Sequence, residues 1–208
     1  QDDTLLYAGS LRAPVVLMAL TDKVISLGVV KWEEGRLYLS KLDTTKQYNF
    51  TFILKAFSSA KPSAHPWGFR VKGVRLTDVK GCYKNIPARS QMRLGAAHFA
   101  ANVEEMDLKE KRIIIEEAEA IRPYLLMAGG STTAATAPVR KTSSSKGFNR
   151  SGWQIELHSC SIEQAAYGYE RLTAPPAPKG IDFRHLHITN ASARVRKCVL
   201  TVDMVKGE

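Results

Sequence analysis

The chain has few cysteines and no long apolar segment. Only three cysteines, Cys82, Cys160 and Cys198, occur among 208 residues, and their wide separation argues against a disulfide framework and favours a reducing compartment. No apolar stretch reaches the ~20 residues that a membrane-spanning helix needs, and the longest candidate, 15–30, is interrupted by polar residues at 21–23. We therefore expect a folded domain without a membrane span, whose core does not depend on disulfides.

The motifs of the common enzyme classes are also missing. There is no glycine-rich phosphate-binding loop and no nucleophile elbow. His187-Ile188-Thr189 matches half of a two-histidine phosphoesterase signature, but no second His-x-Thr occurs. We predict no catalytic residue, no cofactor and no enzyme activity; an enzyme with an unrecognised site is the remaining alternative.

Acidic residues are scarce in the middle of the chain. The net charge is +10, and residues 36–93 hold twelve basic but only two acidic side chains. A concentrated basic segment is typical of a phosphate-binding surface. The segment favours a nucleic-acid partner, while an acidic protein partner, an anionic membrane surface and a solvated basic face remain alternatives.

Aromatic and basic residues interleave within this segment, as binding of single strands requires. Phosphates need basic groups, and bases stack on aromatic faces. Alternation over 36–42 places Arg36 and Tyr38 on one face of a strand, so Tyr38 is the first candidate for stacking, although an ordinary edge tyrosine fits equally well. The predicted nucleic-acid-binding residues are Arg36, Tyr38, Lys41, Lys46, Lys55, Arg70, Lys72, Arg75, Lys80 and Arg93.

The assignment of three of these residues to a common face depends on a predicted bulge. The apolar phase of the strand at 69–76 slips by one residue at Gly73, as a glycine bulge would cause. With that slip, Arg70, Lys72 and Arg75 share a broadly polar face. They are the best candidates for phosphate contacts, and a role in solubility alone is the alternative.

Most of the chain has the pattern of β-strands. Short runs rich in apolar, aromatic and β-branched residues alternate with turn residues. Glu33-Glu34-Gly35 reads as a hairpin turn, and a helix starting at Phe52 is an alternative to the end of one strand. The predicted strands cover 4–9, 13–20, 24–32, 36–42, 46–57, 69–76, 91–101, 153–160, 183–189 and 194–205.

Residues 107–128 predict the one main amphipathic helix. Asp107 followed by Glu110 is a capping-box signature. Apolar residues then follow a 4-3-4 spacing, from Ile114 to Leu125, which is typical of a buried helical stripe. Pro123 would kink or end this helix, and Gly129-Gly130 would cap it. The predicted fold class is therefore α+β, with antiparallel sheets, one helix and a β-rich C-terminal extension.

Composition divides the chain into three parts. Residues 131–152 are rich in Ser, Thr and Ala and carry basic residues, which predicts a flexible linker. It would separate a nucleic-acid-binding domain, 1–130, from the extension, 153–208. No metal site is expected, although pairs spaced two apart on strands leave one zinc set as a low-ranking alternative. That set is His158, Cys160, His185 and His187.

Residues 5–130 resemble the Whirly-type single-strand nucleic-acid-binding fold, the group of the plant organellar Whirly proteins and the kinetoplastid mitochondrial guide-RNA-binding proteins. The likeness lies in the order of elements and in a few stretches. These stretches are Tyr7-Ala8-Gly9, Glu34 to Leu39, Lys46 to Phe52, Met92 to Leu94, Asn102 to Glu104 and Ile121 to Leu126. The resemblance implies binding of single strands across a sheet, usually by a tetramer in an organelle.

Together these features predict a single-strand nucleic-acid-binding protein. We expect RNA as the partner, in RNA processing or editing within a mitochondrial ribonucleoprotein, and a homo- or hetero-oligomer. A structural subunit of a large organellar complex such as the mitochondrial ribosome is the alternative, and a cytoplasmic or nuclear location is the alternative to the mitochondrial matrix.

Overall fold

The computed structural model describes residues 5–16, 24–43, 48–52, 68–107, 110–130, 152–201 and 205–206, and these residues form one β-sheet. Apart from two helical residues, Thr51 and Phe52, the described residues contain no helix. The strands are β1 Leu6–Tyr7, β2 Ser10–Arg12, β3 Val15–Val16, β4 Val24–Glu33, β5 Arg36–Lys41, β6 Gly68–Asn85, β7 Ser90–Asp107, β8 Arg112–Ile121, β9 Tyr124–Gly129, β10 Gln154–Arg171, β11 His185–Leu200 and β12 Val205–Lys206.

Several short strands are the two halves of longer ones. β4 and β5 both pair in parallel with β6, in one unbroken register. β8 and β9 likewise share the register of their parallel pairing with β10, and both pair antiparallel with β7. The sheet is therefore a row of long strands in chain order, from β1–β3 through β4–β5, β6, β7, β8–β9 and β10 to β11 and β12.

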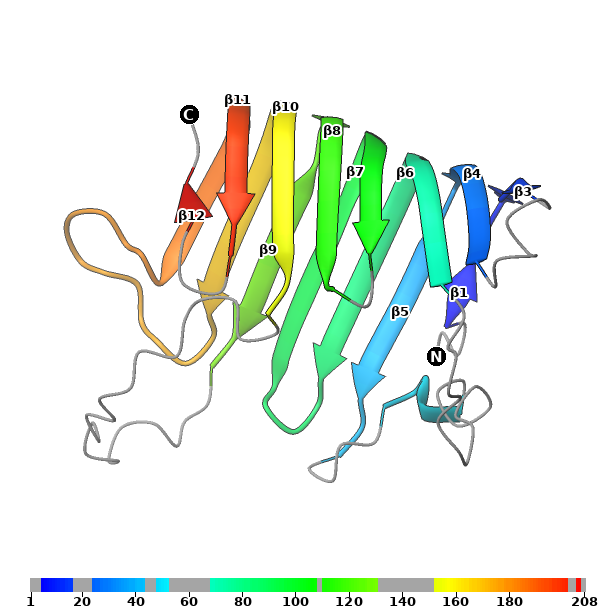
Figure 1. Ribbon diagram of the computed structural model, residues 1–208. Helices are drawn as coiled ribbons and strands as arrows, with labels where there is room; N and C mark the ends of the chain where they lie inside the picture. Colours follow the sequence, from blue (N-terminus) through cyan, green and yellow to red (C-terminus); the bar gives the residue numbers. More distant parts are fainter. Residues whose placement is uncertain are drawn as a thin grey trace.

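The long strands bend along a common line, here called the crest, so that the sheet folds over into two layers (Figure 1). On this line lie residues with a left-handed backbone, which is uncommon outside glycine and marks a bend. The register aligns Glu34 with Asp78 and Arg122 with Gln164 in neighbouring strands. The crest residues with positive φ are Glu34, Asp78, Arg122, Gln164 and Asn190.

The crest adds one residue to the side-chain alternation of each strand. Before it, even-numbered residues of β4 such as Trp32 lie on one face; after it, odd-numbered residues of β5 such as Leu37 lie on that face. In an uninterrupted strand, the residues on one face are either all even-numbered or all odd-numbered, so this change shows that the alternation slips by one residue at the crest. The slip therefore keeps one face of the sheet apolar on both sides of the bend.

The predicted helix over 107–128 is wrong, and with it the α+β fold class. Of the described residues in this range, Asp107 ends β7, Glu110 and Lys111 lie in the turn before β8, and most of the rest belong to β8 and β9. The Asp107 carboxylate does accept a hydrogen bond from the Glu110 backbone N–H at 2.9 Å, but within a hairpin turn. The three consecutive isoleucines at 113–115 are β-branched and suit a strand. Pro123, which lacks an N–H, lies beside the crest where β8 ends.

One predicted turn and one predicted bulge are corrected as well. Glu33-Glu34-Gly35 does not reverse the chain, because β4 and β5 continue in the same direction along β6. Gly73 is not a bulge: Leu27 pairs with Val71 and Val29 with Gly73, so the register stays constant there. The slip occurs at Asp78. The predicted strands at 91–101 and 153–160 are confirmed as parts of β7 and β10.

The C-terminal segment completes the same sheet. β10 pairs in parallel with β8 and β9 and antiparallel with β11. Residues 131–151 of the predicted linker lie outside the described residues. Nowhere in the described part of the chain is there a helix with the length and apolarity to cross a bilayer.

Candidate functional site

One face of the folded sheet carries a continuous apolar band. On each side of the crest, two rows of apolar side chains run across the strands in register. We call this the apolar band. Its larger members are Val30, Trp32, Leu37, Leu39, Val74, Leu76, Tyr83, Met92, Leu94, Phe99, Leu125, Met127, Ile162, Tyr167, Tyr169, Leu186, Ile188 and Val195.

The apolar band is not sealed from solvent. Among the described residues the buried apolar side chains are Ala101, Ile114, Ala118 and Ala120, of which three are alanines, and no side chain is less than 2% exposed. The large members of the band are all partly exposed, and Leu94 reaches 45%. Interiors of folded domains are close-packed, so a partly exposed apolar surface of this extent indicates a place for something else to bind.

The band lies on the inner side of the fold. The Trp32 ring, from one layer, lies against the backbone of buried Gly35, where the other layer begins, so that a Cβ at residue 35 would come within 2.5–2.9 Å of the ring. A cavity of about 580 Å³ opens on the same face and is lined by Tyr83, Met92 and Met127 together with Tyr169. Volumes of 300–1,000 Å³ are typical of small-molecule sites.

Polar residues edge the band on both layers. On the layer of β4, β6 and β8, the row after Val74 and Ala118 contains Lys72 and Glu116. On the other layer, the outer row pairs Lys41 with Asn85 and ends at Arg171, which also borders the cavity. A molecule with an apolar body and a polar end therefore finds matching surfaces on this face.

The opposite face of the second layer carries a basic and aromatic cluster. Arg36 pairs with Lys80, and Tyr38 lies in the row that also contains Arg93. The Lys84 ammonium lies 5.3 Å from the centre of the Tyr38 ring, within range of a cation–π interaction, and a hydrogen bond with Tyr38 raises the pKa of Lys84. We call Arg36, Tyr38, Lys80, Lys84 and Arg93 the basic face.

Part of this charge is neutralised at the crest. The Asp78 carboxylate contacts Lys80 at 3.1 Å and Arg36 at 3.3 Å. Hydrogen bonding and charge from Lys80, then from Arg36, lower the pKa of Asp78. No ion pair is seen for Lys84 or Arg93 with the described residues, so these two are the cations most open to a ligand.

The ten predicted nucleic-acid-binding residues do not lie on one surface of the structure. Four of them, Arg36, Tyr38, Lys80 and Arg93, share the basic face, and Lys84 joins them unpredicted; its alternation with Cys82 and Lys80 could have identified it. Lys46 and Lys55 lie outside the described residues, and Lys41 lies at the edge of the apolar band.

The three residues assigned to a common polar face do not share one. Arg70 and Lys72 alternate onto the face that carries Val74, whereas Arg75 lies on the opposite face. The Arg75 guanidinium donates hydrogen bonds to the Ala101 carbonyl at 2.9 Å and to Asn102 Oδ1 at 2.6 Å. Arg75 therefore tethers β6 to β7.

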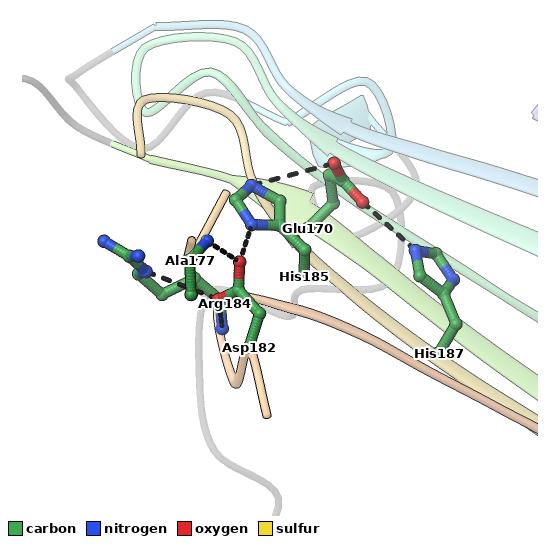
Figure 2. A network of polar contacts seen from close by, with 6 residues as sticks. All are labelled: Glu170, Ala177, Asp182, Arg184, His185 and His187. Carbon is green, nitrogen blue, oxygen red and sulfur yellow. Dashed lines mark hydrogen bonds and ion pairs between the residues drawn. The ribbon is translucent and has the colours of Figure 1, made fainter. Parts of the chain in front are cut away.

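A second polar cluster anchors the loop before β11 (Figure 2). The Asp182 carboxylate accepts hydrogen bonds from the backbone N–H groups of Ala177 and Arg184, at 2.6 and 3.0 Å, and contacts His185 Nδ1 at 2.8 Å. Glu170 lies 3.9 Å from His185 and 3.2 Å from His187.

The contact between Asp182 and His185 shifts the pKa values of both side chains. The hydrogen bond with Asp182 raises the pKa of His185, and the bonds from His185 and Ala177 hold the pKa of Asp182 well below its usual range. Both side chains are 17% exposed. The signal was visible in the sequence only as the short spacing of Asp182 and His185.

The zinc set is not assembled. His158 and Cys160 lie in the first half of β10, whereas His185 and His187 pair with its last residues, Glu170 and Gly168. In the described ranges no group of three or more His, Cys, Asp or Glu residues could hold a metal. All three cysteines are free thiols.

No family model, curated protein or solved structure matches this chain. Its candidate functions therefore rest on the two faces of the sheet.

Proposed function

We propose that this protein binds the hydrocarbon chain of a lipid-like molecule along the apolar band. The observation that supports this most is the exposure of large apolar side chains on the inner side of the fold, where Leu94 is 45% exposed and no large described side chain is fully buried. A polar or nucleic-acid ligand would leave these side chains in contact with water. A hydrocarbon ligand would remove them from it.

The dimensions of the band suit an extended chain. From β4–β5 to β11 it crosses five strand intervals, or about 24 Å at ~4.8 Å each. The hydrocarbon chain of a lipid spans one leaflet of a bilayer core, about 15 Å or half of the ~30 Å core, so the band is long enough to hold such a chain. Each methylene removed from water contributes about 0.8 kcal/mol, so a dozen contribute on the order of 10 kcal/mol before the costs of association.

The charged edges suggest how such a ligand is oriented. Lys41 and Arg171 lie in the polar row beyond Leu39 and Tyr169. An anionic or polar head placed in this row keeps its contact with water while its chain lies over the band. Burial of a charged head among the apolar rows would instead cost several kcal/mol.

Quenching of Trp32 by a brominated fatty acid tests this proposal. Trp32 belongs to the band, so a version of the chain with Trp67→Phe and Trp153→Phe reports on the band alone. We expect saturable quenching. Absence of saturable quenching would refute hydrocarbon binding at this face.

Two leucines supply a matched pair of variants. Leu94 lies in the band and Leu126 on the opposite face, and they are 45% and 39% exposed. Leu94→Lys places a charge against the chain and should weaken binding at least tenfold, since burying an unpaired charge costs more than 1.4 kcal/mol. Leu126→Lys should leave binding within about twofold. Equal effects of the two variants would contradict the proposed location.

Binding of single-stranded nucleic acid is the second candidate, and the basic face favours it. Tyr38 offers an aromatic surface among Arg36, Lys80, Lys84 and Arg93, and stacking on such a surface contributes ~1–3 kcal/mol per base. An organellar ribonucleoprotein or ribosomal role stays a prediction from the sequence.

A filter-binding titration with single-stranded RNA at several salt concentrations tests this candidate. Lys84→Ala combined with Arg93→Ala should reduce the slope of log affinity against log salt by about 1.4, since each lost phosphate contact on a single strand accounts for ~0.7. Arg12→Ala with Lys31→Ala, two paired cations of the other layer, is the control. An unchanged slope in the first variant would eliminate the basic face as the binding surface.

A further inference from the structure

β11 presents a long sheet edge with no neighbour. Its one side pairs with β10 over nearly its whole length, but on the other side β12 pairs only with Val199 and Leu200. From His185 to Arg196, backbone N–H and C=O groups along this edge have no strand beside them within the described chain. Such an edge is a template for pairing with another strand.

β11 carries apolar side chains at symmetric positions on either side of the crest. Leu186 and Ile188 precede the crest on the apolar face, opposite Tyr169 and Tyr167 of β10. Ala193 and Val195 follow it on the same face, opposite Ile162 and Cys160. Antiparallel pairing of β11 with itself about the Asn190–Ala191 bond therefore brings Leu186 against Val195 and Ile188 against Ala193.

We propose that two copies of this chain associate through their β11 edges, antiparallel and related by a two-fold axis between Asn190 and Ala191. Two-fold association of identical surfaces is the commonest form of homo-oligomer. Because the axis passes through the crest, the first layer of one copy continues into the second layer of its partner. The apolar bands of the two copies then become one continuous surface.

The polar face of β11 is compatible with this register. Arg196 of one copy would lie opposite His185 of the other, whose neighbour on β10 is Glu170. Arg194 would lie opposite His187, which contacts Glu170 at 3.2 Å. Two arginines of each copy would thus approach a histidine–carboxylate cluster of the other, in which Asp182, 2.8 Å from His185, and Glu170 offset the positive charge that the raised pKa gives His185. Opposite charges near the pairing edge favour this register, whereas uncompensated like charges would oppose it.

The exposure of Ile188 supports the same surface. Ile188 is 44% exposed in the single chain, although it belongs to the apolar band. Pairing with Ala193 of a second copy would cover it. Cross-strand apolar pairs are the units that stabilise a sheet, and this pair occurs twice about the axis.

Sedimentation velocity over a range of protein concentrations tests the proposal. We expect a reversible species of twice the 23.0 kDa chain mass. Ile188→Lys should raise the dissociation constant at least tenfold, because the axis brings two buried charges into one interface. Ile86→Lys is the control: Ile86 is 57% exposed in the β6–β7 turn, far along the sheet from β11, and its substitution should leave association unchanged.

Hydrogen exchange then locates the contact. Amides at 186–196 should become protected as the concentration rises through the dissociation constant. A monomer at every concentration, or a dimer that tolerates Ile188→Lys as well as Ile86→Lys, would overturn the proposal. Open-ended polymers would also overturn it, because they require pairing between unlike edges. Lipid binding by a strictly monomeric chain would leave the proposed function standing while this inference fails.

Discussion

Replacement of Gly95 by alanine tests the close pairing of β6 and β7 beside the crest. A Cβ at residue 95 would lie 2.5 Å from the Val79 carbonyl oxygen and 2.8 Å from two atoms of the Tyr124 ring. The ring can rotate, but the carbonyl belongs to the β6–β7 ladder and can move only with its strand. Such overpacking typically costs 1–3 kcal/mol. Alanine recovers about 0.5–1 kcal/mol by restricting the unfolded chain.

Because the clash is with a backbone oxygen, the upper half of that range applies, about 2–3 kcal/mol, and we expect Gly95→Ala to lower the free energy of unfolding by about 1–2.5 kcal/mol. For a chain of this size the melting temperature should fall by roughly 2–10 °C, at ~2–4 °C per kcal/mol. Urea unfolding followed by circular dichroism would measure the change, with an unchanged m-value showing that the unfolded state is unaffected.

A neighbouring glycine provides the control. At Gly81 the nearest atom to an added Cβ is Leu94 Cδ1, at 3.3 Å, and a leucine methyl can give way. Gly81→Ala should change stability by no more than about 0.5 kcal/mol. If Gly95→Ala is as stable as the parent chain, the strands are not as close at this point as described, and the alignment of the crest is wrong.

Three further outcomes follow from the geometry. Asp182→Asn should lower the pKa of His185 towards its ordinary value of 6.5, because Asp182 is the main group that raises it; an NMR titration of the His185 ring would measure this, and an unchanged pKa would contradict the pair. In the parent chain the stability that this raised His185 pKa contributes should be fully present below pH ~6.5 and decline as pH rises through the raised value. Thermal melts between pH ~5 and ~9 should show this decline, and Asp182→Asn should reduce it, since Asp182 is the largest of the groups that raise the pKa. Asn49→Ala should destabilise the chain by about 1–2 kcal/mol in urea unfolding, because the Asn49 side chain bonds both the Ser40 N–H and the Tyr38 carbonyl at 2.9 Å; a loss below ~0.3 kcal/mol would show that water replaces these bonds.

Local pattern located several of the strands, but it was wrong at 48–52, where the predicted strand 46–57 instead forms an isolated bridge, a turn and two helical residues, and it was misleading for the helix. The segment 107–128 has a capping signature and a 4-3-4 apolar spacing, which the helix period explains. Apolar residues of the same segment also fit the period of a strand, at Ile114, Ala118 and Ala120. Pairing with the neighbouring strands decides that the segment is a strand and not a helix. β7 and β10 flank β8 on both sides and use its backbone hydrogen bonds, which a single segment cannot reveal.

Some residues of the basic face could be predicted from the sequence, and others only from the structure. Alternation of basic and aromatic residues indicated Arg36 and Tyr38 on one face, since strand period alone decides that. Lys80, Lys84 and Arg93 join them only because β6 and β7 lie beside β5. Arg70 and Lys72 were placed with Arg75 through a slip at Gly73, whereas the actual slip at Asp78 depends on the crest that all the long strands share.

The sequence by itself determined the β character of most segments, the basic excess of residues 36–93 and the absence of a long apolar span, because composition and a period of two are local properties. The tertiary structure alone decided where each strand bends and which face is inner. Bends at Glu34, Asp78, Arg122 and Gln164 become a crest only when the strands align, and that alignment joins short apolar runs, distant in the chain, into one band.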